Sequence, residues 1–322
     1  MTRSETRSGA ALVPSFADVP LRGDNPVPAP NQAAAADHIE AAARAHGYAA
    51  EQLDWHTPEG IVVKPLYIGA DRDAVVARAR AAGVSAIVVP AVTASNFAAV
   101  RDCCQRYPGC VPAYGIHPLF VGRAGEEDLA TLRQWLESEL AGPYPPVAIG
   151  EIGLDFFVPD FDAARQEYFF VEQLKIARDL GLPVLLHVRR AQDAILKQLR
   201  QVFGKHAGAG GIAHAFNGSR QQADAFIDLG FKLGFGGAMS FPRALRIRQL
   251  AASLPLDAIV LETDAPDMSP EFIGKARNSP ETLPRIAAVL AGLRGISPET
   301  VIAATSVNAH AILPGLRQPI RS

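Results

Sequence analysis

Four polar side chains interrupt or follow apolar stretches of this sequence, and all four are of metal-binding types. Glu151 breaks the run VAIGEIGL, His187 follows PVLL, His214 follows GGIA and Asp264 follows AIVLET. Two neutral imidazoles and two carboxylates suit a divalent cation, because imidazoles favour Zn²⁺ or another transition ion and carboxylates also accept Mn²⁺ or Mg²⁺. A bridging carboxylate would let the set hold two ions instead of one.

Each of these residues has an ordinary structural explanation when it is taken alone. A single histidine at a strand end is commonly a hydrogen-bonded structural residue, and Glu151 could cap a following helix. Four such breaks are harder to explain in this way, because uncompensated carboxylates in apolar surroundings are costly and a divalent cation offsets that cost directly. We therefore predict that the four side chains share a metal site.

The elements that would position these residues alternate regularly along the chain. Amphipathic helices separate seven short apolar stretches, as a parallel sheet covered on both faces requires. These predicted strands lie at about 85–92, 110–118, 147–154, 182–188, 210–216, 231–239 and 257–266. The carboxyl ends of the strands of a parallel barrel meet at one rim, so the four side chains are expected to meet there.

An eighth strand would complete a (β/α)₈ TIM barrel of the α/β class. The candidate is the segment 60–68, GIVVKPLYI, which is atypical because Pro65 removes a ladder hydrogen-bond donor. The alternative is an open, doubly wound sheet, but no glycine-rich phosphate fingerprint follows an early strand. We expect an N-terminal extension, partly flexible, over 1–59 and a hydrolase barrel over 60–316.

The composition limits the partners and the location. The chain has 322 residues, 48% of them hydrophobic, and a net charge of −2, so a polyanion would have to be held locally. The first residues offer no apolar run long enough for a signal peptide or a membrane span. Three cysteines argue against a disulfide framework and favour buried packing. We expect a cytoplasmic protein without membrane association.

Six segments together resemble a known family in their order and spacing. They are AIGEIGLD, LLHVRR, IAHAFNGS, LGFGGAMSFPRA, LETDAPDM and GKARNSPE. They resemble the TatD-related metal-dependent deoxyribonucleases, a branch of the amidohydrolase superfamily, over about 70–315. The resemblance implies a TIM barrel that hydrolyses phosphodiester bonds of DNA through a metal-activated water, with one or two Mg²⁺, Mn²⁺ or Zn²⁺ ions.

The resemblance also implies roles for individual residues. It makes Glu151, His187, His214 and Asp264 the metal ligands, and Asp264 the catalytic residue that accepts a proton from the attacking water. His117, in YGIHP, matches the family and is read as a substrate contact, with strand-end packing as the alternative. Arg189, beside His187, would hold the scissile phosphate, with a solvated surface charge as the alternative.

The sequence departs from the family at its beginning. The family's first strand carries Asp-x-His-x-His, which is absent from its expected place, so activity is expected to be reduced. The nearest candidate is His56, in LDWHTPEG, which lies several residues too far upstream of the first helix. Residues 14–70 instead resemble the N-terminal arm of methylmalonyl-CoA mutases, which DWHTPEGIVVKPLY carries most distinctly. That arm lies outside the mutase's cobalamin and acyl-CoA sites, so mutase activity is not implied and its protein partner stays unknown.

Two other functions remain open from the sequence. The first keeps the metal but changes the substrate to an ester or amide, such as an aminoacyl-tRNA linkage, since related barrels carry out acyl hydrolysis with similar ligands. The second is a catalytically impaired barrel whose N-terminal arm binds another protein. Comparing the turnover of DNA and of an aminoacyl ester separates the first from the leading hypothesis.

Overall fold

The computed structural model describes residues 55–56, 62–63, 69–158, 161–204 and 208–317. The chain divides into two compact units, Met1–Arg72 and Asp73–Ser322. Apart from Trp55 and His56, the expected extension over 1–59, and with it most of the mutase-like segment, lies outside the described residues. Within the first unit, β1 (Trp55–His56) pairs with β2 (Val62–Val63) in a two-stranded antiparallel sheet.

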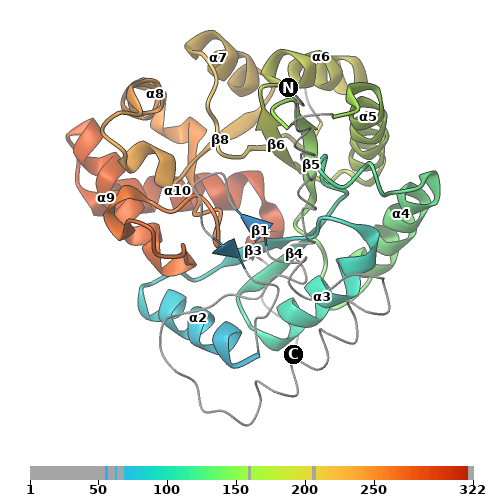
Figure 1. The fold of residues 1–322 in the computed structure, drawn as a ribbon, viewed down its shortest axis with the longest axis horizontal. Helices are drawn as coiled ribbons and strands as arrows, with labels where there is room; N and C mark the ends of the chain where they lie inside the picture. Colours follow the sequence, from blue (N-terminus) through green and yellow to red (C-terminus); the bar gives the residue numbers. More distant parts are fainter. Residues whose placement is uncertain (1–54, 57–61, 64–68, 159–160, 205–207, 318–322) are drawn as a thin grey trace, which may run out of the picture. The chain divides into compact units, whose positions relative to one another are not determined.

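The second unit contains a parallel sheet of seven strands in sequential order, with helices around its outside (Figure 1). The strands are β3 (Ile87–Pro90), β4 (Cys110–Tyr114), β5 (Ala148–Asp155), β6 (Val184–Arg189), β7 (Gly211–Ala213), β8 (Phe231–Phe235) and β9 (Ile259–Leu261). Each pairs in parallel with the next. All seven strands predicted after residue 84 are confirmed, and the curled parallel sheet with its surrounding helices confirms the predicted TIM-barrel class.

The helices alternate with the strands of the parallel sheet as predicted, and the last two helices follow the last strand. They are α2 (Gly69–Ala81), α3 (Phe97–Arg106), α4 (Glu126–Leu140), α5 (Ala163–Leu180), α6 (Gln192–Phe203), α7 (Arg220–Asp228), α8 (Leu245–Ser253), α9 (Leu283–Arg294) and α10 (Pro298–Ile312). Ser297 caps α10, because its side chain accepts a hydrogen bond from the Thr300 amide, and Pro298 occupies the first helical position.

The first barrel strand differs from the expectation. Val62 and Val63, inside the predicted strand 60–68, pair antiparallel with Trp55 and His56, and the parallel sheet consists of β3 to β9 among the described residues. The rest of that segment lies outside the described residues. The side chain of His56, the nearest candidate for the missing histidine pair, lies outside them as well.

The core is formed by apolar side chains between the sheet and the helices. Fully buried examples include Phe170 of α5, Leu186 of β6 and Phe226 of α7. None of the three cysteines forms a disulfide, and Cys104 and Cys110 are buried, which confirms the packing role for these two. No single helix among the described residues is long and apolar enough to cross a membrane. The segments 280–294 and 298–312 have the required length and apolar composition only when taken together, and the chain bends by 110° between them.

Candidate metal centre

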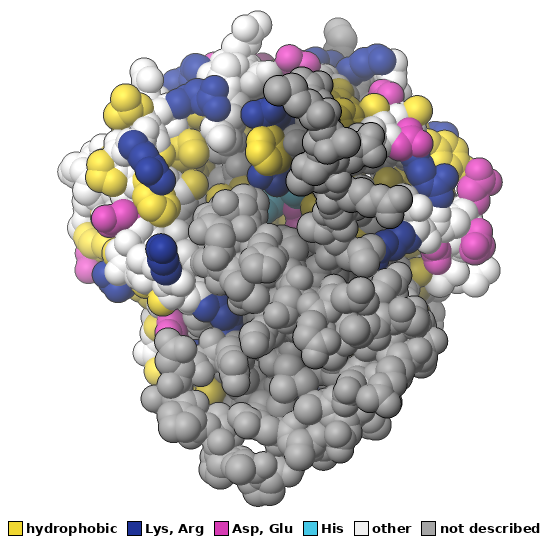
Figure 2. Space-filling view, in the orientation of Figure 1, with side chains coloured by type: hydrophobic (Ala, Val, Ile, Leu, Met, Phe, Trp, Pro, Cys, Tyr) yellow, Lys and Arg dark blue, Asp and Glu magenta, His cyan; other side chains and the backbone are white. Residues whose placement is uncertain are grey.

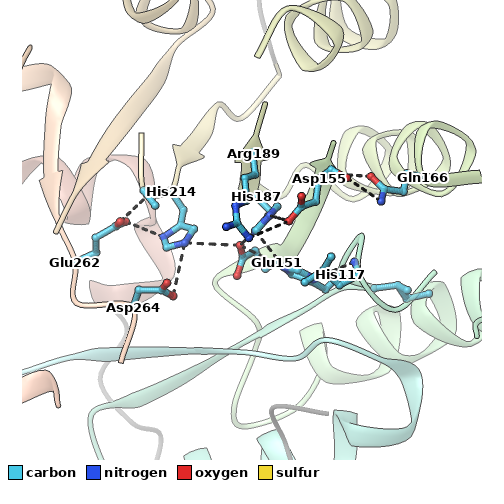
Figure 3. A network of polar contacts seen from close by, with 12 residues as sticks. His117, Glu151, Asp155, Gln166, His187, Arg189, His214, Glu262 and Asp264 are labelled. Atoms are coloured by element: carbon cyan, nitrogen blue, oxygen red, sulfur yellow. Dashed lines mark hydrogen bonds and ion pairs between the residues drawn. The ribbon is translucent and has the colours of Figure 1, made fainter. Parts of the chain in front are cut away.

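The four predicted ligands meet at the carboxyl ends of the strands. Glu151 lies within β5, His187 within β6, His214 directly after β7 and Asp264 shortly after β9. Glu151 Oε1 is 2.9 Å from His187 Nδ1 and 3.8 Å from His214 Nε2. His214 Nε2 is in turn 3.6 Å from Asp264 Oδ1 (Figure 3). The structure therefore brings all four side chains into one cluster.

An irregularity in β5 aims Glu151 into this cluster. The register of β5 with β6 shifts between Ile149 and Ile152, so that one extra residue is accommodated. Gly153 follows with a φ of +149°, and a Cβ there would lie 2.1 Å from the backbone carbonyl oxygen of His187. Because glycine has no Cβ, the two strands can approach closely at this point. The bulge and the glycine together set the carboxylate against the imidazole.

A second carboxylate holds each of the two histidines. His187 Nε2 is 3.0 Å from Asp155 Oδ2, and His214 Nδ1 is 3.1 Å from Glu262 Oε2. Glu262 is held in turn by the Ala215 amide, which donates to its Oε1 at 2.7 Å. When the N–H of each ring points to its outer carboxylate, the other ring nitrogen faces the centre of the cluster with a lone pair.

This arrangement fits a divalent cation. If His187 gives up its second proton and keeps the N–H that is directed to Asp155, its Nδ1 presents a lone pair to Glu151, so two acceptor atoms face each other. A cation between them resolves that conflict. Donor atoms that share an ion at bond lengths of about 2.1 Å lie roughly 3 to 3.5 Å apart, close to the 2.9 to 3.8 Å separations found here. The pairs Glu151–His187, Glu151–His214 and His214–Asp264 thus have the spacing of neighbouring ligands. Among the described residues, the three side chains whose ligand atoms all lie within 4.8 Å of one another are His117, Glu151 and His187.

The same contacts displace the pKa values of the cluster. Burial by itself lowers the pKa of His187, but its hydrogen bonds to Asp155 and Glu151 outweigh burial and raise that pKa to about 9. Burial opposes ionisation of Glu151, yet His214 and His187 hold its pKa well below the ordinary value. Burial raises the pKa of Asp264 to about 7, with the charge of Glu151 adding to it and His214 opposing it. The cluster therefore attracts positive charge.

His117 lies beside this cluster, three residues beyond β4, and presents a hydrogen-bond donor to it. Its Nε2 is 3.1 Å from His187 Nδ1 and 3.7 Å from Glu151 Oε1, so spacing alone would allow these three residues to share an ion. The Leu119 amide donates to its Nδ1 at 3.2 Å. Burial, followed by the proximity of His187, lowers the pKa of His117 to about 3. The neutral ring therefore carries its proton on Nε2, which favours donation over metal ligation.

Arg189 ends β6 at the edge of the same cluster. Its Nη1 is 3.9 Å from Asp155 Oδ2, the oxygen that also contacts His187. The Arg189 guanidinium also lies over the ring of Phe157, 3.9 Å from its centroid. The side chain is partly exposed, so this cation borders both the cluster and solvent.

The loop after β9 holds Asp264 through a buried asparagine. Asn278 is fully buried, and its side-chain amide donates to the carbonyl oxygens of Thr263 at 2.6 Å and Asp267 at 2.7 Å. Its own side-chain oxygen accepts a hydrogen bond from the Ser279 amide at 2.9 Å. The carbonyls on either side of Asp264 are thus tied to one side chain.

Residues with strained backbone conformations lie close to the candidate metal ligands at the ends of the strands. Arg190 directly after β6, Ala215 directly after His214, and Asp264 have φ values of 55°, 44° and 55°. Such left-handed conformations cost a residue other than glycine about 1 to 2 kcal/mol. The sharp corners turn the chain away from the sheet at the site.

Sequence reasoning placed the inner residues but assigned no role to the outer carboxylates. Asp155 stands four residues after Glu151, a spacing that favours the same face of a strand and could have indicated a shared partner. Glu262 stands two residues before Asp264, which is the same kind of signal. The sequence also contained no indication of the buried side-chain amide of Gln166, in α5. Its Oε1 accepts a hydrogen bond from the Asp155 backbone amide at 2.8 Å, and its Nε2 donates to the Asp155 carbonyl oxygen at 3.1 Å.

Comparison with known proteins identifies the family. The family model described as TatD related DNase matches residues 63–314. The chain belongs to the TatD-related DNase family. It is 39% identical over 242 residues to the uncharacterized metal-dependent hydrolase YjjV of Escherichia coli K12, which covers 75% of this chain and 91% of that protein. The recognition based on the six segments is therefore confirmed, while the mutase-like segment stays a prediction.

A crystal structure of YjjV and one further relative bear on the family's fold and chemistry. The crystal structure of YjjV, a TatD homologue, matches this chain with a TM-score of 0.72 over 76% of this chain and 92% of that one. A protein of Cronobacter sakazakii named 3'-5' ssDNA/RNA exonuclease TatD is 38% identical over 244 residues, which cover 74% of this chain and 90% of that protein. The barrel and nearly the whole length of these relatives are thus represented here.

Proposed function

We propose that this chain is a divalent-metal-dependent hydrolase that cleaves phosphodiester bonds at the ends of single-stranded nucleic acid. The observation that carries the proposal is the pair of imidazoles, each backed by its own carboxylate, converging on Glu151 beside Asp264. Family membership and the exonuclease name of the Cronobacter sakazakii relative support the substrate class. A cytoplasmic location is proposed as well, and it is supported by the lack of a disulfide among the three cysteines, all of which lie in the described part of the chain.

Glu151, His187, His214 and Asp264 would hold the cation. When bound, a divalent cation lowers the pKa of water toward neutrality and offsets the charge that develops on the attacked phosphoryl oxygen. Asp155 and Glu262 hold the N–H of each neutral histidine on its outer nitrogen, which directs the lone pair of the inner nitrogen to the cation. These residues therefore prepare the site before substrate arrives.

Three side chains act on the substrate in this proposal. Asp264 accepts the proton of the attacking water at a carboxylate oxygen. His117 donates its Nε2–H to a phosphoryl oxygen. Arg189 pairs with the phosphate from the rim, and its partial exposure leaves it accessible to a strand from solvent.

The experiment is nuclease turnover of end-labelled single strands with Mg²⁺, Mn²⁺ or Zn²⁺, comparing the wild type with Asp264→Asn. We expect Asp264→Asn to lose at least about 100-fold in kcat, the usual effect of removing a general base. Asp257→Asn, an exposed residue at the opposite end of β9, serves as the control and should retain wild-type turnover. Equal rates for wild type and Asp264→Asn would refute the catalytic assignment, and turnover of an aminoacyl ester instead of DNA would refute the substrate.

The number of bound ions tests the consequence of the altered first strand. We propose that the site holds one ion firmly and works more slowly than relatives that carry the first-strand histidine pair. Metal analysis of the purified protein measures the stoichiometry directly. Two tightly held ions per chain would contradict this part of the proposal and would point to replacement ligands nearer the N-terminus.

A further inference from the structure

Phe157 stands out beside the metal centre because an aromatic ring is left open to solvent between two cations. It is 44% exposed, although it comes only two residues after the fully buried Asp155. The guanidinium of Arg189 lies 3.9 Å from its ring centroid and that of Arg190 lies 4.5 Å from it. Charged and hydrophobic side chains lie beside the hollow in which histidine and acidic side chains are visible (Figure 2).

Short contacts fix this cluster relative to the catalytic residues. The Phe157 amide donates to Asp155 Oδ1 at 2.9 Å, while Asp155 Oδ2 contacts His187 at 3.0 Å and Arg189 at 3.9 Å. One buried carboxylate thus holds the histidine of the metal centre, the arginine and the backbone of the aromatic residue. A nucleotide whose phosphate reaches the metal centre would find the ring of Phe157 directly beside it.

The chemistry of the cluster matches an unpaired nucleotide. Bases stack on aromatic rings and on arginine guanidinium planes in a sequence-tolerant way, because every base has a π face. The two guanidinium groups add positive charge for the backbone phosphates, which a chain of net charge −2 can supply only locally. A base inside a duplex is already stacked on both sides and cannot use the ring.

We propose that Phe157, together with Arg189 and Arg190, forms a stacking subsite for the terminal unpaired base of a nucleic acid strand. The inference deepens the proposed nuclease function and rests on it. The subsite selects frayed or single-stranded ends over paired ends. The alternative is that the ring only holds the two arginines in place for phosphate binding.

The test compares Phe157→Leu with wild type on two strands of equal length, one with ordinary bases and one whose terminal nucleosides are abasic. Removing one stacking ring is expected to lower kcat/KM for the ordinary strand by roughly tenfold or more, mainly through KM. The abasic strand should change by less than about twofold, because it has no base to lose. Phe157→Trp should retain the preference for the ordinary strand. Tyr168→Leu, which removes an equally exposed ring on α5, should leave both substrates unchanged.

The outcomes separate this inference from the proposed function. Equal losses on both strands would show that the ring only positions arginines, and no loss on either would show that it plays no part; both would overturn the subsite. A wild type that cleaves neither strand would refute the nuclease function instead. Fluorescence anisotropy of the same labelled strands then decides the subsite, because only a stacking role weakens binding of the ordinary strand alone in Phe157→Leu.

Discussion

Replacing Asp155 by asparagine tests whether the outer carboxylates prepare the histidines for a cation. Asp155 is 0% exposed, and its two side-chain oxygens have different partners: Oδ1 accepts from the Phe157 amide at 2.9 Å, and Oδ2 faces His187 Nε2 at 3.0 Å. Asparagine keeps the shape but offers one oxygen and one NH₂ group. Neither orientation of that amide satisfies both partners while His187 Nδ1 stays free to bind a cation.

The magnitude follows from the two orientations. If the NH₂ group faces the Phe157 amide, two donors oppose each other. If it faces His187, it requires a lone pair on Nε2, and the neutral ring must then carry its proton on Nδ1, the atom that faces Glu151. Either arrangement loses a hydrogen bond to a charged group, worth about 1.5 to 3 kcal/mol. Cation binding should therefore weaken by about 10- to 150-fold.

The assay is competition for Zn²⁺ between the protein and a fluorescent chelator at fixed pH. Asp162→Asn is the matched control, because it makes the same substitution at the exposed N-cap of α5, where asparagine caps as well as aspartate does. We expect the control to bind Zn²⁺ as wild type does. Affinity of Asp155→Asn within twofold of wild type, in a protein with an unchanged circular dichroism spectrum, would refute the reasoning about the ring proton.

Three further predictions concern the framework of the site. Gly153→Ala should lower the free energy of unfolding in urea by about 4 kcal/mol or more and abolish metal binding, since its Cβ would meet a carbonyl oxygen at 2.1 Å. Gly274→Ala, where a Cβ would lie in open space, should lower it by only about 1 to 2 kcal/mol. Equal losses in the two variants would contradict the packing argument. Asn278→Ala should lower the free energy of unfolding by about 2 to 4 kcal/mol, because it leaves buried carbonyls unpaired; a loss below about 1 kcal/mol would contradict it. When the folded protein is alkylated at pH 8 and analysed by mass spectrometry, we expect only Cys103 to be modified. Burial raises the pKa of Cys110 to about 12, so that about one Cys110 thiol in ten thousand is ionised at this pH. Rapid modification of all three cysteines in the folded protein would disprove that burial.

The sequence was sufficient to predict the repeating elements of the barrel. Its apolar runs are short, lie between helices with clear polar and apolar faces, and each corresponds to one strand of the sheet. The same regularity located Glu151, His187, His214 and Asp264 at one rim, because parallel strands deliver their carboxyl ends to a common edge. These predictions follow from the regular spacing of apolar runs along the sequence.

The remaining features depend on side-chain geometry that periodicity does not encode. Which nitrogen of His187 meets Asp155 depends on the rotation of the ring and on the bulge in β5, and neither leaves a mark in the spacing of apolar residues. The pairing of Val62–Val63 with Trp55–His56 was also missed. An apolar run containing proline predicts an extended segment, but it does not specify the partner or the direction of pairing.

The left-handed corners at Arg190, Ala215 and Asp264 have a consequence for the adaptation of this enzyme to heat. Directed evolution for thermal tolerance alone should introduce glycine at Ala215 first, because relief of the corner there gives a net gain of up to about 1 kcal/mol and sacrifices no functional group. The same substitution would loosen the neighbouring His214. The variants with the highest thermal stability are therefore expected to have lower turnover than the wild type. At Ala215, thermal stability and turnover change in opposite directions.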